Sequence, residues 1–417
     1  MKTLVERRAL FQLALSAGLS ACGGDDDGSK GASSQADTEV SLYSWWVAPG
    51  EADALNALIA VHDADYPHER IVNAALVSGE NARDVLNQQL ASGHPPDLFQ
   101  ENAYDIGTFF DEHPKGLEPL GDLFRELGLF DVVVPEVIDD VSFDGEVYSM
   151  PVNIHRENAL HYNQRVFSEL GLDAPTTLDE LWSTCDKLKQ AGITPLAISY
   201  KGWILGLVFN ALAGASMGIE AYQAYFSGEK ALDEPALRAA IELLDRVLTD
   251  YVNESASDPT FDWADAAELV LNGEAAMFIH GDWVKGYLTE QGLEPGDGFG
   301  VVGMPGAADL FLYGVDVFAM PVGAPHAEAA KDFLRTVASK AGQVAFNRLK
   351  GSSPIRLDTQ IENLDVVGQA TLLSLRDAKI RMLARGKAVW DEGLAAFAVS
   401  RDVDALIAVY RDNPPGK

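Results

Sequence analysis

From residue 39 onwards, short apolar runs alternate with stretches whose apolar residues recur at helical spacing. The first three such pairs are residues 40–43 with 52–66, 71–77 with 81–91, and 98–99 with 104–111. This order of elements is typical of a mostly parallel β-sheet that is covered by helices. The sequence therefore predicts an α/β fold.

The same alternation returns after Pro151 and indicates a second lobe. Helical patterns occur at 178–190, 204–213, 234–251, 264–272 and 282–290, and Asp144-Gly145 between two apolar runs is a hairpin signal. Later apolar runs at 299–302 and 311–320 precede helical patterns at 327–338 and 373–385. Because strands return after a helical insertion, we expect the chain to cross between the lobes more than once. The predicted lobes comprise residues 39–151 with 303–340, and 152–302 with 341–417.

The first residues have the pattern of an export signal. Arg7 and Arg8 precede an apolar run at 9–21, which is too short to span a bilayer as a mature helix. Leu-Ser-Ala before Cys22 resembles a bacterial lipobox, so we expect a signal peptide at 1–21, a lipid on Cys22 and a polar tether at 22–38. An ordinary cleaved signal is the alternative, and the arginine pair also resembles a twin-arginine signal.

Composition excludes several classes of partner. The 417 residues are 47% hydrophobic, which suffices for two or three cores, and the formal net charge is -32. This charge gives no basic surface for nucleic acid or for an anionic bilayer, so a neutral or cationic ligand is expected. The eight histidines lack metal-ligand spacing, and Cys185 lies in a helical pattern as a small core residue, so neither a metal site nor a disulfide is expected.

No catalytic motif is present, and no cofactor is expected. The chain lacks Gly-x-Ser-x-Gly, His-Glu-x-x-His, a Walker loop and Gly-x-Gly-x-x-Gly after a strand. A glycosidase needs only two carboxylates, and 63 acidic residues leave room for such a pair. An exported carbohydrate hydrolase that uses Asp282 or Asp316 is therefore one interpretation that the sequence leaves open.

Tryptophans stand at strand ends and helix starts. Trp45 and Trp46 end the first apolar run, Trp203 follows Tyr-Lys-Gly, Trp263 begins a helical pattern, and Trp283 follows His-Gly-Asp. The edge of an α/β sheet where strands end and helices start is a common ligand site. An indole there can stack on a sugar ring and donate a hydrogen bond. Since neighbouring strand residues face opposite sides, only one of the first two would face a ligand.

Four stretches of the chain together resemble a known family. They are Ser44-Trp-Trp-Val-Ala-Pro-Gly-Glu-Ala-Asp-Ala-Leu, Pro96-Asp-Leu-Phe-Gln100, Met150-Pro-Val-Asn-Ile-His-Arg-Glu-Asn158, and the segment from Trp263 to Trp283 with its Gly-Glu-Ala-Ala-Met and Gly-Asp-Trp. They resemble the extracellular solute-binding proteins of family 1, and most of all the glucose/mannose-binding subunits of bacterial ABC importers. The resemblance runs from about residue 40 into the C-terminal helices.

The resemblance implies a two-lobed periplasmic-binding-protein fold with hinge strands, which closes on a sugar. By similarity to hexose binders, Trp263 and Trp283 would be aromatic walls, and Gln100 and Asp316 would bond sugar hydroxyls. The remaining candidate sugar-binding residues are Trp45, Trp46, Glu51, Gly79, Glu80, Asn81, His155, Asp282 and Arg385. The free N–H groups of a helix start also favour 79–81 on physical grounds.

Two of these candidates leave alternatives open. His155 and Arg156 lie where the chain first crosses to the second lobe, so a hinge role and a ligand contact are equally expected. Arg385-Gly386 stands where hexose binders have His-Gly, and a guanidinium is a fixed, permanently charged donor. The expected protein is a monomeric, lipid-anchored sugar-binding subunit in the periplasm or at the cell surface, with a membrane permease as partner. A sensory receptor is an alternative partner.

Overall fold

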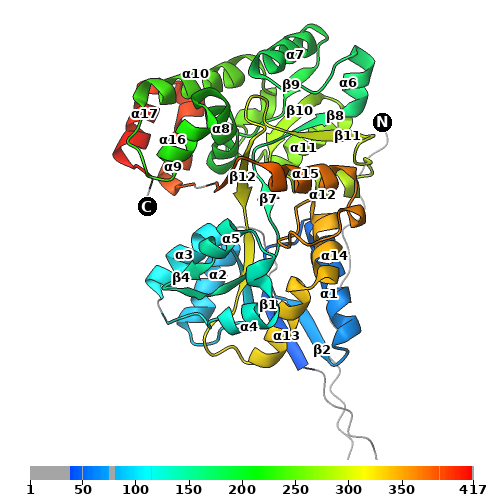
Figure 1. Ribbon diagram of the computed structural model, residues 1–417. Coiled ribbons are helices and arrows are strands. Elements are labelled where there is room, and N and C mark those ends of the chain that lie inside the picture. The colour runs from blue at the N-terminus through cyan, green and yellow to red at the C-terminus, as the bar shows by residue number, and fades with distance from the viewer. Residues whose placement is uncertain (1–37, 49, 75–79, 114, 385, 416–417) are drawn as a thin grey trace, which may run out of the picture. The chain divides into compact units, whose positions relative to one another are not determined.

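The computed structural model describes residues 38–415 except 49, 75–79, 114 and 385 (Figure 1). The predicted signal peptide, the lipidation site Cys22, most of the tether, Gly79 and Arg385 lie outside these residues. The side chains of residues 80–84, which include Glu80 and Asn81, also lie outside the described part.

The first lobe is built on a five-stranded sheet in the order β2-β1-β3-β13-β6. Its strands are β1 (Thr38–Tyr43), β2 (Glu69–Asn73), β3 (Leu98–Asn102), β6 (Ser149–Pro151) and β13 (Asp316–Ala319). β1 runs parallel to β2 and β3, whereas β13 runs antiparallel to β3 and β6. The sheet is mixed rather than mostly parallel, because β6 and β13 carry the chain out of this lobe and back, with no crossover helix between β13 and its neighbour β3.

Helices of the first lobe come from two distant parts of the chain. They are α1 (Glu51–Asp65), α2 (Glu80–Ala91), α3 (Ala103–Glu112), α4 (Gly121–Glu126), η1 (Leu129–Asp131), α5 (Pro135–Asp140), α13 (Ala327–Ala338) and α14 (Lys340–Lys350). α14 packs along α1, and Phe346 of α14 belongs to the same buried cluster as Leu58 of α1.

The second lobe carries a four-stranded sheet in the order β11-β8-β10-β9. Its strands are β8 (Ala159–Asn163), β9 (Thr194–Leu196), β10 (Ala275–His280) and β11 (Phe299–Gly303). β10 is parallel to β9, and β8 is antiparallel to both β10 and β11. The helices of this part of the chain are α6 (Gln164–Leu170), α7 (Leu178–Gln190), α8 (Gly202–Met217), α9 (Ile219–Phe226), α10 (Glu234–Asp250), η2 (Glu254–Ser257), α11 (Trp263–Asn272), α12 (Val284–Glu290), η3 (Ile361–Asn363), α15 (Val366–Asp377), α16 (Ala388–Ser400) and α17 (Val403–Asp412).

Three segments meet where the chain passes between the lobes. β6 is followed by β7 (His155–Arg156), and β12 (Leu310–Gly314) is followed by β13, while Ile154 and Ser353 exchange backbone hydrogen bonds of 2.9 Å in both directions. β7 and β14 (Ile380–Leu383) flank β12 in a three-stranded sheet. This paired backbone forms the hinge. The exact lobe boundaries expected from the sequence remain a prediction.

The apolar core is divided between the lobes. One buried cluster contains Val40, Phe99 and Phe318 of the first sheet, and two others contain residues such as Leu160 and Phe278 of the second. Each lobe therefore buries an apolar face of its own sheet, as independent layers require. Cys185 is buried in α7, as expected.

Several predicted elements are confirmed, and one is wrong. β4 (Ser142–Phe143) and β5 (Glu146–Val147) form the expected hairpin, with φ of 51° at Asp144 and 81° at Gly145. The predicted helix at 373–385 is wrong, because α15 ends at Asp377 and β14 follows. There, residues 380–383 pair in parallel with β12, and this long-range pairing outweighs the local helical pattern. The run 311–320 is split into β12 and β13 at Val315.

A close contact between glycines joins α12 to α1 and α14. A Cβ on Gly286 would lie 2.5 Å from the carbonyl oxygen of Leu349, and a Cβ on Gly351 would lie 2.6 Å from that of Asp282. A Cβ on Gly50 would lie 2.8 Å from the carbonyl carbon of Gly286. Only glycine permits this backbone approach, which brings the start of α12 against the end of α14.

We expect Gly286→Ala to lower the free energy of unfolding by about 1–3 kcal/mol, because the added methyl group would push against backbone that cannot rotate away. Urea denaturation of both proteins measures the difference. Gly386→Ala is the control, since a Cβ there meets no atom within 4 Å. Equal stability of Gly286→Ala and the parent would show that the contact is loose.

Candidate ligand-binding site

The first strand ends before the tryptophan pair. β1 stops at Tyr43, so Trp45 and Trp46 lie in the following loop, where the alternation of strand side chains no longer applies. Trp46 is only 1% exposed and packs between Phe318 and Phe346, with ring centroids 5.6 and 4.8 Å away. Trp45 is half-buried against the first core. Trp46 is therefore the buried member of the pair.

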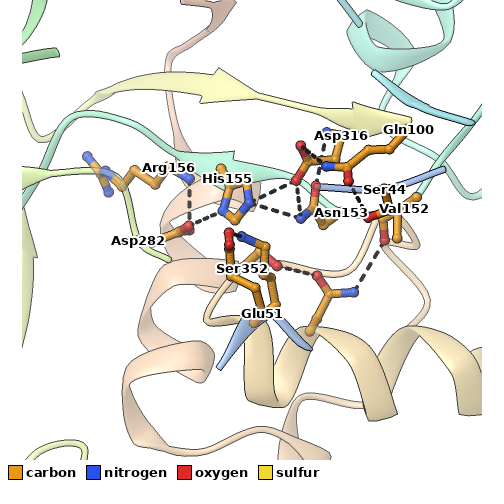
Figure 2. A network of polar contacts seen from close by, with 12 residues as sticks. Ser44, Glu51, Gln100, Val152, Asn153, His155, Arg156, Asp282, Asp316 and Ser352 are labelled. Atoms are coloured by element: carbon orange, nitrogen blue, oxygen red, sulfur yellow. Dashed lines mark hydrogen bonds and ion pairs between the residues drawn. The ribbon is translucent and has the colours of Figure 1, made fainter. Parts of the chain in front are cut away.

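A buried chain of hydrogen bonds crosses the hinge (Figure 2). The Ser44 hydroxyl donates to Gln100 Oε1 over 2.6 Å, and Gln100 Nε2 donates to Asp316 Oδ1 over 3.3 Å. Asp316 Oδ2 accepts from Asn153 Nδ2 at 2.9 Å and lies 3.1 Å from His155 Nε2. The network unites β3, β13 and the hinge, and it joins two predicted site residues, Gln100 and Asp316.

His155 continues this chain into the second lobe. Its Nδ1 lies 2.5 Å from Asp282 Oδ1, and the other Asp282 oxygen accepts from the backbone N–H of Arg156 over 2.8 Å. Burial, the largest single effect, acts to lower the pKa of His155, but the charge of Asp282 and the hydrogen bonds to Asp282 and Asp316 together outweigh it and raise the pKa to about 9. Burial likewise acts to raise the pKa of Asp316, but the hydrogen bond from His155 holds it below its usual range.

The side chain of Arg156 packs into the hinge and does not contact Asp282 or Asp316. Its buried guanidinium bonds Asn158 Oδ1, the Ser374 hydroxyl and the carbonyl of Leu310, and it lies over the ring of Phe311. These contacts join β7 to β12 and α15. Burial lowers the pKa of Arg156 to about 10.

Lys350 is a candidate residue that sequence reasoning missed. This buried lysine ends α14, and its Nζ donates to Glu51 Oε1 at the start of α1 over 2.7 Å. The same Nζ lies 5.7 Å from the ring centroid of Trp46 and 6.0 Å from that of Trp283, within cation–π range. It thus brings together the predicted residues Trp46, Glu51 and Trp283. In sequence it is an ordinary lysine in the last turn of a helix, so no local signal marks it.

Three tryptophans of the second lobe surround His280. The rings of Trp203, Trp263 and Trp283 lie 5.4, 6.0 and 4.9 Å from the His280 ring, and they stand near the starts of α8, α11 and α12. Trp283 also contacts the His155 ring edge-on at 5.1 Å. β9 and β10 end at this edge of the sheet, so Trp263 and Trp283 lie beside strand ends.

His280 is fully buried, and both of its ring nitrogens lack a hydrogen-bond partner among the described residues. Nearby His161 bonds the carbonyl of Gly281 through Nε2, while its Nδ1 is unpaired among these residues. Burial lowers the pKa of His161 to about 4 and that of His280 well below its usual value. Both rings are therefore neutral in the folded protein at neutral pH.

Other features of the described chain lie outside this site. A hollow of about 430 Å³ beside α1 and β2 shares only Trp46 with the candidate residues, so it is not the polar site. The described residues contain no group of three or more side chains suited to hold a metal ion. Among the helices described, none combines the length and apolar character needed to cross a membrane.

Residues 48–344 match the model of a protein family, the bacterial extracellular solute-binding proteins. The chain belongs to this family. A Pyrococcus horikoshii member, named an uncharacterised ABC transporter extracellular-binding protein, is 32% identical over 91% of this chain and 89% of its own. A probable sugar-binding periplasmic protein of Mesorhizobium japonicum is 30% identical over 82% of this chain and 81% of its own. The xylose/arabinose-binding protein XacG of Haloferax volcanii is 27% identical over 92% and 86%.

Solved structures share the fold of this family member. The bacterial solute receptor AcbH, described with a preference for β-D-galactopyranose, superposes with a TM-score of 0.77 at 16% identity and covers 89% of this chain and 96% of its own. Maltose-bound MalE3 of T. maritima gives 0.74 at 18% identity over 90% and 98%. These likenesses confirm the predicted two-lobed α/β fold.

We expect the protein to lose stability as the pH falls below about 6.5, because His161 and His280 are charged in the unfolded chain but neutral in the fold. A histidine whose pKa is lowered in the fold contributes stability that is fully present above the pKa of the unfolded chain. As the pH falls from there toward the pKa in the fold, each such histidine lowers the free energy of unfolding by about 1.4 kcal/mol per pH unit. His280→Phe should reduce the loss between pH 7 and 5, measured by thermal unfolding. The exposed His94→Gln variant should keep it. An unchanged acid slope in His280→Phe would contradict the neutral state of His280.

Proposed function

We propose that this chain is the substrate-binding subunit of a bacterial ABC importer and that it binds one neutral sugar, a hexose, between its lobes. The observation that carries the proposal is the convergence of Asp282, Asp316 and Lys350 on the hinge, next to the indole rings of Trp46 and Trp283. These groups come from both lobes.

The chemistry of the site suits a sugar. A buried polyol loses hydrogen bonds to water, so carboxylates and amides must replace them while an aromatic face covers its C–H groups. Asp282, Asp316 and Gln100 supply acceptors, since each carboxylate oxygen can take more than one hydrogen bond. The indole N–H groups of Trp263 and Trp283 have no partner within the described part of the chain and supply donors.

The relatives support a sugar as the ligand class. One is named a probable sugar-binding periplasmic protein, and another is named for xylose and arabinose. The choice of a hexose rests on the sequence resemblance to glucose/mannose-binding subunits. Glu51 joins the site through Lys350, while Gly79, Glu80, Asn81 and Arg385 remain sequence-based candidates.

Transport requires that sugar binding change the arrangement of the two lobes. A ligand that contacts both lobes better when they are closed shifts the population toward the closed form, and a membrane permease would dock to that form. A lipid on Cys22 and the tether after it would hold the protein at the outer face of the membrane or in the periplasm. The protein would act as a monomer without a cofactor.

We expect Trp283→Ala to fold cooperatively but to weaken the best hexose at least tenfold, about 1.4 kcal/mol, because the ring covers one face of the site. A thermal-shift screen of hexoses and disaccharides first identifies the ligand, since a sugar at 100 times its Kd adds about 2.7 kcal/mol of stability. Isothermal titration calorimetry then gives both affinities. Trp182→Phe is the control, because Trp182 stacks on Tyr251 in the second core.

Two outcomes would contradict the proposal. An unchanged Kd in Trp283→Ala would remove that residue from the site. Steady release of reducing ends from an oligosaccharide would favour the alternative, an exported carbohydrate hydrolase that uses Asp282 and Asp316. Both carboxylates contact His155, and this engagement favours binding over catalysis.

We expect Cys22→Ser to release the protein from the membrane fraction, because a thiol is required for the lipid attachment. Fractionation with immunodetection measures the distribution, and mass spectrometry of the mature N-terminus measures the lipid. Cys185→Ser is the matched control and should stay in the membrane fraction. Retention of Cys22→Ser with an intact signal segment would show anchoring by another route.

A further inference from the structure

His155 lies between two carboxylates that come from different lobes. Asp282 precedes α12 in the second lobe, and Asp316 begins β13 in the first. Only the hinge strand β7 places one ring between them (Figure 2). The imidazole is buried, and both of its nitrogens face these oxygens, at 2.5 and 3.1 Å.

We infer that His155 is a positioning residue, which as an imidazolium donates to both carboxylates and holds them together across the hinge in the arrangement that receives the ligand. The ligand in this inference comes from the proposed function. The imidazolium with its two hydrogen bonds does not depend on that function. It differs from the ligand contact that the sequence left open for His155, because both ring nitrogens are already engaged.

The contacts of both ring nitrogens with carboxylate oxygens, at 2.5 and 3.1 Å, favour the charged ring. A neutral imidazole carries one N–H and could donate to one carboxylate only, which would leave a lone pair facing the other. Asn153 Nδ2 has two hydrogens; it donates to Asp316 Oδ2 over 2.9 Å and lies 3.0 Å from His155 Nε2, while Asn153 Oδ1 accepts from the Asp316 backbone N–H. With the charged ring, the amide and the imidazolium donate side by side to one oxygen, Asp316 Oδ2.

The surrounding charges support this state. Two buried carboxylates near one site would repel each other and would favour protonation of one of them. The cation between them removes this repulsion, and the pKa of His155 is raised to about 9. The other titratable groups that face His155 are Lys350 at the end of α14, whose positive charge opposes protonation of the ring, and Glu157 two residues along the chain. Burial raises the pKa of Glu157 to about 8.

The same ring connects the two halves of the site. Asp316 also binds Gln100, and Asp282 directly precedes Trp283, whose indole touches the His155 ring edge-on. Loss of the positive charge on His155 would therefore weaken the hold on Asp282 and Asp316, the carboxylates of both lobes, at the same time. A neutral side chain at position 155 cannot restore the positive charge between the two carboxylates.

Two measurements test the inference on the full mature protein. Histidine ring NMR of the ligand-free protein should show His155 titrating near pH 9, and Asp282→Asn should shift this titration toward 6.5. Calorimetry with the hexose found in the screen should show affinity constant from pH 7 to 8 and falling as the pH rises through about 9. His155→Gln should bind at least tenfold more weakly at pH 7 and should lack this alkaline fall.

Matched variants separate the contributions. His62→Gln removes another buried histidine, one that bonds Thr336 in the first lobe, and should leave both affinity and its pH profile unchanged. Glu157→Gln should keep the fall through pH 9, which separates His155 from the neighbouring acid. If His155→Gln does not fold, the NMR titrations of the parent and of Asp282→Asn decide the charge.

Each outcome has a definite meaning. Titration of His155 at or below 6.5, or a His155→Gln variant with the affinity and pH profile of the parent, would overturn the inference. Absence of binding by any sugar would refute the proposed function instead, and the NMR titration would still decide whether His155 carries the charge.

Discussion

The contacts of His155 with Asp282 and Asp316 are the interaction on which the arrangement of the site depends. They place a positive ring between two buried negative groups at the point where the chain passes between the lobes. Burying any one of these charges alone would be costly, whereas the three together satisfy one another. The hinge can therefore hold these polar groups in a buried environment.

The rest of the site is arranged around this centre. Gln100 and Asn153 complete the bonds to Asp316, and Lys350 links Glu51 to the indole rings of both lobes. Close glycine contacts allow the backbone at the start of α12 to lie against the end of α14, which brings Asp282 toward the hinge. In the second lobe, the neutral His280 ring contacts the indoles of Trp203, Trp263 and Trp283.

Much of the fold could be predicted from local patterns. The helix at 178–190 coincides with α7, because Thr177 caps it and its apolar residues keep one face. The Asp144-Gly145 hairpin was predictable since both turn residues adopt positive φ. The helix expected at 373–385 failed because strand pairing with β12, about 70 residues earlier, decided the conformation of residues 380–383. Of the residues joined by the contacts around the hinge, Gln100, Asp316, Trp46 and Trp283 were named from the sequence, but Lys350 was not.

The sequence by itself determined the alternation of strands and helices, the family, and the residue types available for a ligand, because periodicity, caps and motifs act over about ten neighbouring residues. The tertiary structure alone decided which of the 63 acidic residues face His155, which tryptophan is buried, and that Lys350 joins the site. Those properties depend on distances between side chains more than a hundred positions apart, and on the burial that raises or lowers their pKa values.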